Sequence, residues 1–185
     1  MSGTKLKDWC GVWGRNGLRG ALVLGSLSLS PIVHADSPLP PPARHEICSG
    51  DKSSCIELLP GQDGIVRKRN SAGTWLELWR VPGWHRWGFL SNDGRHFVAC
   101  VTQDLVPLDL ANPPPVALLY SPTGLLRTVQ FREVVESDKK LQRTVSHWHW
   151  GRCTGLGKAE DSVLFETVTG KYSVSFSTLK VVKIP

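Results

Sequence analysis

The sequence lacks the short motifs that would dictate a hydrolytic or nucleotide-dependent reaction. His45-Glu46 is not followed by the second histidine of the metalloprotease motif H-E-x-x-H, and the G-x-S-x-G turn of esterases does not occur. The segment from Gly151 to Lys158 differs from a phosphate-binding loop, because five residues separate its outer glycines and Ala159 replaces the Ser or Thr that would hold Mg²⁺. This segment predicts a glycine-rich turn.

A long apolar run is also missing. The apolar stretch from Gly20 to Val33 spans about 14 residues, whereas a bilayer crossing needs roughly 20. Val33-His34-Ala35 matches a signal-peptidase cleavage site of the A-x-A type, and the stretch is preceded by basic residues. These are Lys5, Lys7, Arg15 and Arg19. We predict that residues 1–35 are a cleaved bacterial signal peptide, with an uncleaved amphipathic N-terminus as the alternative. A periplasmic or secreted chain without a stable membrane anchor would begin at Asp36.

A strong charge of one sign is not present either. Without residues 1–35, the chain has 18 Lys and Arg against 15 Asp and Glu, a net charge of +3. Its tight basic cluster, Arg67-Lys68-Arg69, is typical of a solvated hairpin, whereas a phosphate-binding protein concentrates such residues on one face. We therefore expect no nucleic-acid partner.

Cysteine is scarce, but its number is even after the predicted cleavage site. The four residues are Cys48, Cys55, Cys100 and Cys153. Disulfides persist in exported proteins, and the absence of a C-x-x-C pair argues against metal ligation. Among the three pairings that four cysteines allow, we expect Cys48 with Cys55 and Cys100 with Cys153. The second bridge would close a long loop and would be worth on the order of 4 kcal/mol in a chain-entropy model.

The remaining chain has the pattern of a β protein. Residues 36–43 (DSPLPPPA) are proline-rich and predict an extended spacer, and we assign residues 44–185 to a single β domain. Short apolar runs alternate with turn signals, which is the signature of hairpins. The clearest hairpins join 86–90 to 96–102, 116–120 to 125–131 and 163–167 to 172–182. We predict about eight to ten antiparallel strands in meander sheets, as a sandwich or a partial propeller, with one short helix over 132–142.

One hairpin carries a family resemblance. Phe89 to Val98 contains the turn Ser91-Asn92-Asp93-Gly94, and it resembles the blade hairpin of β-propeller proteins, in which an S-x-D-G turn joins two inner strands. The segment Leu119 to Leu126 is similar in style. The resemblance covers about 25 residues and lacks both the Trp-Asp signature of that family and a clean 40-residue period. It implies four-stranded meander sheets and carries no function with it.

Tryptophan and histidine gather in two places, at Trp84-His85-Arg86-Trp87 and at His147-Trp148-His149-Trp150. Tryptophan and arginine are enriched in binding hot spots. We therefore predict a binding surface formed by Trp84, His85, Arg86, Trp87 and Trp148. For each tryptophan, burial in the core is the competing interpretation.

These observations favour an exported, non-catalytic binding protein that recognises another protein or an envelope component. An inhibitor or immunity protein of the periplasm is a specific form of this hypothesis. An enzyme is the third interpretation, since a pair of carboxylates could be brought together only by the fold. No catalytic residue can be named from the sequence, and no cofactor is expected under the first hypothesis.

The alternative function is binding of a transition metal. In a strand, His147 and His149 share one face at roughly 7 Å, and neutral imidazole suits Cu(II), Ni(II) or Zn(II). His85 or His96 would complete the site if the hairpins pack together. On this hypothesis, replacing His147 and His149 with alanine abolishes metal uptake and leaves the fold intact, as native mass spectrometry would measure. An unchanged metal content would exclude it.

Overall fold

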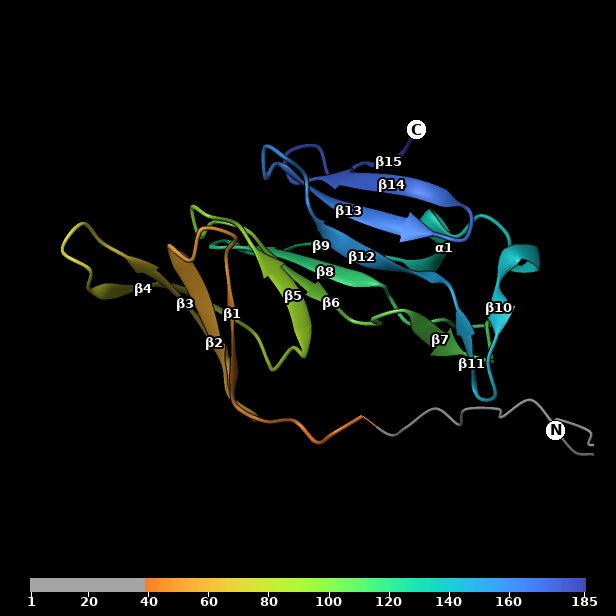
Figure 1. Ribbon diagram of the computed structural model, residues 1–185, viewed down its shortest axis with the longest axis horizontal. Coiled ribbons are helices and arrows are strands. Elements are labelled where there is room, and N and C mark those ends of the chain that lie inside the picture. The colour runs from red at the N-terminus through yellow and green to blue at the C-terminus, as the bar shows by residue number, and fades with distance from the viewer. Residues whose placement is uncertain (1–38) are drawn as a thin grey trace, which may run out of the picture. The chain divides into compact units, whose positions relative to one another are not determined.

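The computed structural model describes residues 39–185, so the predicted signal peptide lies outside the described residues. The fold is mainly β, as predicted, with antiparallel pairing throughout (Figure 1). The first sheet contains β1 (His45–Cys48), β2 (Ser54–Leu58), β3 (Gly64–Arg69) and β4 (Trp75–Val81). The second contains β5 (Trp87–Leu90), β6 (Phe97–Cys100), β8 (Ala117–Ser121) and β9 (Gly124–Val129). The third contains β12 (Gly151–Leu156), β13 (Ser162–Thr167), β14 (Gly170–Ser175) and β15 (Val181–Ile184).

A small three-stranded sheet and two helical turns complete the described chain. The small sheet has the order β10-β11-β7, with β7 (Leu105–Pro107), β10 (Gln142–Arg143) and β11 (His147–His149). Helix α1 (Phe131–Val134) and a 3-10 turn (Asp138–Lys140) lie between β9 and β10. None of the helices in residues 39–185 is long and apolar enough to cross a bilayer.

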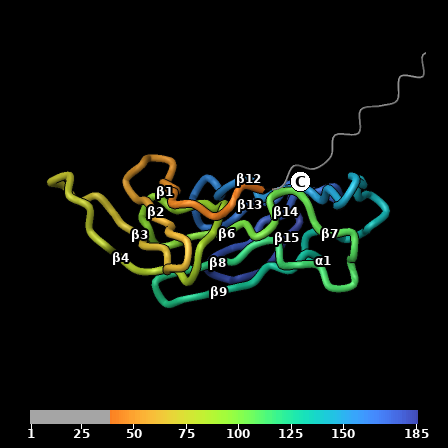
Figure 2. Tube along the Cα trace, turned by 90° about the horizontal axis from the view of Figure 1, so that it is seen from below, coloured from red at the N-terminus to blue at the C-terminus, as the bar shows by residue number. Residues whose placement is uncertain are grey.

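The second sheet is packed on both faces. Along β6, Phe97 and Ala99 enter a core shared with the first sheet, while Val98 and Cys100 enter a core shared with the third sheet. Alternation of side chains across a strand produces this division. Figures 1 and 2 both place β6 and β8 between the strands of the first and third sheets. The continuous apolar run of β6 is therefore the mark of a strand buried on both sides.

The turns that join the first two strands of each large sheet contact one another. Within the β5–β6 turn, Ser91 Oγ donates to Asp93 Oδ1 at 2.6 Å, and Gly94 has φ +73°. Asn92 then connects the sheets, because its Oδ1 accepts from the amide of Asp51 at 3.1 Å and its amide donates to Glu160 Oε2 at 2.7 Å. The S-x-D-G turn thus contributes contacts between sheets as well as a reversal of the chain.

Two local expectations were wrong and a third was confirmed. Within residues 39–185 the structure has fifteen short strands in four sheets instead of eight to ten. One reason is that the run 172–182 is divided by a turn after Ser175. The short helix expected near 132–142 is confirmed as the four-residue α1, and it gives way to the 3-10 turn before residue 142 because Val135 and Ser137 are extended. The glycine-rich segment at 151–158 is mainly strand β12, whose irregularity between Cys153 and Gly155 accommodates the glycines.

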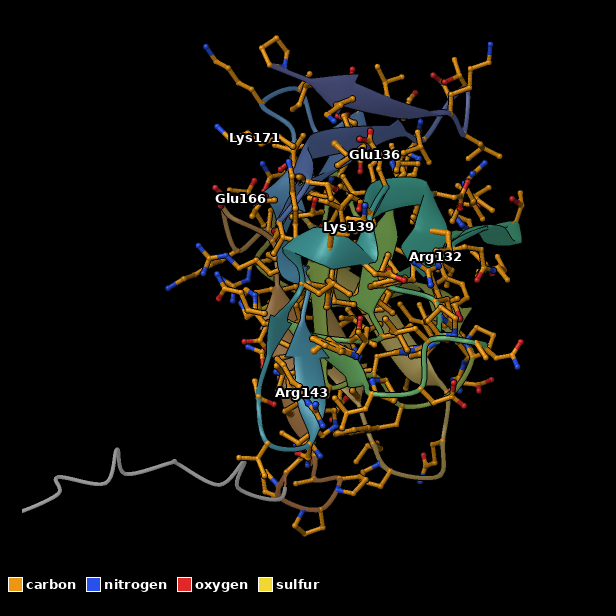
Figure 3. All side chains as sticks on the ribbon, turned by 90° about the vertical axis from the view of Figure 1, so that its right-hand side faces the viewer. Arg132, Glu136, Lys139, Arg143, Glu166 and Lys171 are labelled. Carbon is orange, nitrogen blue, oxygen red and sulfur yellow. A yellow bond between two sulfur atoms is a disulfide. The ribbon has the colours of Figure 1, made fainter. Side chains whose placement is uncertain are left out.

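Charged side chains of both signs lie at the end of the molecule that contains α1 and the third sheet (Figure 3). Lys183 Nζ contacts Glu136 Oε2 at 2.8 Å, and Arg132 pairs with Asp138. Both pairs are exposed, and exposed ion pairs contribute little to stability. This surface is therefore a solvated face of mixed charge.

Gly88 provides a test of the packing around β5. A Cβ at this position would lie 2.4 Å from the Val98 carbonyl oxygen and 2.8 Å from the Phe97 ring. We predict that Gly88→Ala lowers the free energy of unfolding by about 1–3 kcal/mol, because the strand or the ring must shift. At Gly50 a Cβ would meet only Asn92 Oδ1 at 3.9 Å, so Gly50→Ala is the control and should stay within about 0.5 kcal/mol of wild type. Equal stabilities in urea titrations would contradict the prediction.

Candidate functional site

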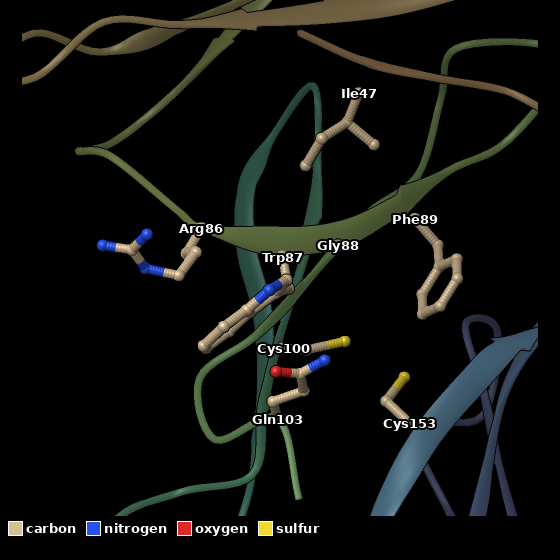
Figure 4. A pocket seen from close by; sticks show the side chains of 8 residues that line it. All are labelled: Ile47, Arg86, Trp87, Gly88, Phe89, Cys100, Gln103 and Cys153. Carbon is tan, nitrogen blue, oxygen red and sulfur yellow. The ribbon is translucent and has the colours of Figure 1, made fainter. Parts of the chain in front are cut away.

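A cavity of about 250 Å³ opens where the first strands of the three large sheets meet. Its lining comes from β1, from β5 and the residue before it, from β6 and the loop after it, and from β12 (Figure 4). The lining residues are Ile47, Arg86, Trp87, Gly88, Phe89, Cys100, Gln103 and Cys153. Trp87 pairs with Cys100 across β5 and β6, and Phe89 pairs with Val98, so these side chains share the face toward the third sheet. The cavity is therefore apolar, with Arg86 as its only charged group.

Arg86 lies between two tryptophan rings at the rim of this cavity. Its guanidinium carbon is 4.9 Å from the centroid of the Trp84 ring and 5.7 Å from that of Trp87. These cation–π contacts hold the side chain in place, and it also donates to the Pro40 carbonyl. Trp84 Nε1 donates to the Ala43 carbonyl at 2.9 Å. Three of the predicted binding residues are thus adjacent, and their role in binding stays a prediction.

His85 and Trp148 do not line this cavity. The His85 ring lies 5.9 Å from that of Phe97 and 5.6 Å from that of Tyr120, and its Nε2 is 2.9 Å from the Pro82 carbonyl. Burial lowers the pKa of His85. Trp148 lies in the small sheet, where its Nε1 donates to the Leu108 carbonyl at 3.2 Å. His85 lies in the loop before β5, so strand alternation does not predict its direction, and the places of both His85 and Trp148 depend on tertiary packing.

The cysteines divide into a bridge and a pair of thiols. Cys48 and Cys55 form a disulfide across β1 and β2, as predicted. The predicted bridge between Cys100 and Cys153 is absent, and both residues are free thiols. They are nevertheless brought together from β6 and β12, and Figure 4 shows their sulfur atoms directed into the same space. A hydrogen bond with Cys100, together with burial, raises the pKa of the Cys153 thiol.

The predicted metal ligands are separated in the fold. His147 and His149 both lie on β11, where His147 Nδ1 is 2.8 Å from Ser146 Oγ. His96, a proposed further ligand, stacks on Phe176 at 4.3 Å, and His85 lies against Phe97 and Tyr120. Within residues 39–185, one group of three potential metal ligands lies close enough together to share an ion, namely Glu46, Cys48 and Cys55. Its two cysteines are joined in the disulfide and are therefore not available as thiolate ligands. Metal binding by His147 and His149 stays a prediction.

His149 lines a second cavity of about 370 Å³, where the small sheet meets the third sheet. Asp104, Arg152 and Glu166 also line it, and Arg152 lies 3.9 Å from Glu166. His149 Nδ1 is buried and has no hydrogen-bond partner in the structure. Charged side chains of both signs line this cavity, whereas Arg86 is the one charged residue that lines the first.

Sequence reasoning missed half of the apolar cavity. The sequence did not single out Ile47, Gly88, Phe89 or Gln103, although Phe89 is two positions from Trp87 and so shares its face of β5. Ile47 and Gln103 have no local signal, because they reach the cavity from another sheet and from a loop. Comparison of the chain with models of known protein families and with curated protein sequences finds no match. The functional argument therefore depends on the geometry of the site.

Two partly buried histidines, His85 and His96, predict a loss of stability in weak acid. Burial lowers the pKa values of both His85 and His96, so the unfolded chain binds their protons more readily than the folded chain. Stability should fall as the pH decreases below the ordinary histidine pKa of about 6.5. In urea titrations at pH 7.5 and 5.5, His85→Gln should lose less stability than wild type. The same decrease in both proteins would refute the assignment to His85.

Proposed function

We propose that this chain is a non-catalytic binding protein that recognises an extended segment of a partner protein at the cavity beside Arg86. The proposal depends on one observation. The cavity has apolar walls, and a single cationic side chain, Arg86, is held at its rim by Trp84 and Trp87. Sites for drug-sized ligands measure about 300–1,000 Å³, and this cavity is smaller, at about 250 Å³. Its size fits one large apolar side chain better than a cofactor.

The strand order supports an extended ligand. β5 and β12 are terminal strands of their sheets, so one edge of each has no strand partner within the described sheets. Both strands contribute residues to the cavity. A peptide in β conformation can add its backbone hydrogen bonds to such an edge while one side chain enters a neighbouring pocket. We infer that this is the binding mode.

The charge at the rim specifies the partner further. Arg86 is positioned by Trp84 and Trp87, so less conformational freedom is lost when its guanidinium pairs with a carboxylate. The partner segment should therefore carry Asp or Glu beside its apolar anchor. Cys153 is not suited to nucleophilic catalysis, because its raised pKa keeps the thiol protonated at neutral pH.

Export to the periplasm remains part of the proposal. The Cys48–Cys55 disulfide is compatible with an oxidising compartment. An inhibitor or immunity protein that caps an enzyme is the specific form we propose, since such a protein needs a shaped surface and no reaction chemistry of its own.

The test uses peptide selection on the full chain. Random peptides displayed on phage are selected against the immobilised protein, and the affinity of the enriched peptide is then measured by calorimetry. We expect an acidic residue next to a large apolar one in the enriched sequence. Trp87→Ala should weaken binding by at least tenfold, as is typical of a hot-spot aromatic, and Arg86→Ala should weaken it several-fold.

The chain offers a matched control at the ends of β3 and β4. Arg69 lies over the ring of Trp75 at 4.8 Å, which is the same type of pair as Arg86 with Trp84. Arg69→Ala and Trp75→Ala should leave the affinity unchanged. Enrichment of peptides without acidic residues, or equal affinities for Arg86→Ala and Arg69→Ala, would refute the proposed site.

A further inference from the structure

The apolar cavity contains two thiols that come from different sheets. Cys100 ends β6 and is buried, while Cys153 lies in β12 and is partly buried. Both line the same cavity, and their sulfur atoms point into one space (Figure 4). Partner recognition needs only the apolar walls and Arg86, so this pair is not explained by the proposed function.

Few side chains around the two sulfur atoms could serve as additional metal ligands. The other lining residues provide an amide, from Gln103, but neither a carboxylate nor an imidazole. Zn²⁺ requires four ligands in a structural site and three protein ligands in a catalytic one, so two sulfurs do not satisfy it. Thiolates are soft ligands that favour Cu(I), Zn²⁺ and iron–sulfur clusters, and among these Cu(I) accepts two-coordinate binding.

Binding of Cu(I) by the two thiols needs no change of oxidation state. Binding replaces the two thiol protons with one Cu(I) and forms two Cu–S bonds, so no electron is transferred and two protons leave. The product carries a net charge of −1. Arg86 lines the same cavity, with its guanidinium on the far side of the Trp87 ring from the two sulfur atoms (Figure 4), and Ile47, Trp87 and Phe89 form its apolar walls.

We propose that Cys100 and Cys153 form a two-coordinate thiolate site for Cu(I) at the junction of the second and third sheets. The bound ion would link β6 to β12. The site is distinct from the metal site predicted at His147 and His149, because it shares no residue with it and uses a different class of ligand. It also does not depend on the identity of the protein partner.

The experiment is an anaerobic titration of the reduced full chain with Cu(I), in competition with a chromophoric Cu(I) chelator. We use the triple variant Cys10→Ser, Cys48→Ser, Cys55→Ser beside wild type, because it leaves Cys100 and Cys153 as the only thiols of the five in the chain. One equivalent of Cu(I) should bind to the triple variant, with release of about two protons at neutral pH. X-ray absorption should show two sulfur neighbours.

The controls separate this site from other causes of uptake. Cys153→Ser in the triple background should lose competitive Cu(I) binding, with the fold checked by circular dichroism. If the triple variant does not fold, wild type is compared with Cys100→Ala and Cys153→Ser, and each should bind one equivalent less. Arg69→Ala, at a residue outside the cavity lining, should bind Cu(I) as tightly as its parent. If Cu(I) uptake is absent after reduction, or is undiminished in Cys153→Ser, the proposal is overturned.

A disulfide between the two cysteines is the competing outcome. If the isolated protein contains this bridge and, after reduction, binds no Cu(I), the pair is a structural cross-link instead of a metal site. Thiol titration before and after reduction identifies that result.

Discussion

Burial of the second sheet on both faces is the constraint on which the rest of the structure depends. In β6, Phe97 and Ala99 pack against the first sheet, whereas the alternate residues, Val98 and Cys100, pack against the third. Phe97, Val98 and Ala99 are all fully buried. Two cores are therefore joined through a single strand, and displacing that strand would expose apolar surface on both sides. The hydrophobic effect, at roughly 25 cal/mol per Å², places the outer sheets against the central one.

This packing also creates the apolar cavity. The first strands of the three large sheets, β1, β5 and β12, meet on the side where the turns at 49–53, 91–95 and 157–161 contact one another through Asn92. The hydrogen bonds of Asn92 hold the hairpin ends together, while the strands behind them leave a gap beside Gly88. The absence of a side chain at Gly88 allows the close approach of Phe97 and the Val98 carbonyl. The cavity is thus a consequence of how three twisted sheets meet at one edge.

The chemistry of the cavity combines three features that have no common origin in the sequence. Its walls are apolar, its rim has a guanidinium held between two indole rings, and its interior contains two thiols. The walls and the rim support recognition of an apolar and acidic segment, whereas the thiols have the properties of soft-metal ligands. The two roles concern different atoms of one site, so they can be separated by substitution.

The sequence by itself determined the β class, the positions of the main hairpins and the Cys48–Cys55 bridge. These properties depend on signals within about ten residues, such as the turn Ser91-Asn92-Asp93-Gly94 and the short spacing between the two cysteines. The rest was decided by contacts between sheets. The inward position of His85, the absence of a bridge between Cys100 and Cys153, and the entry of Ile47 and Gln103 into the cavity all depend on segments far apart in the chain. A local pattern records which residues share a face of a strand, but only the tertiary structure determines which other sheet that face meets.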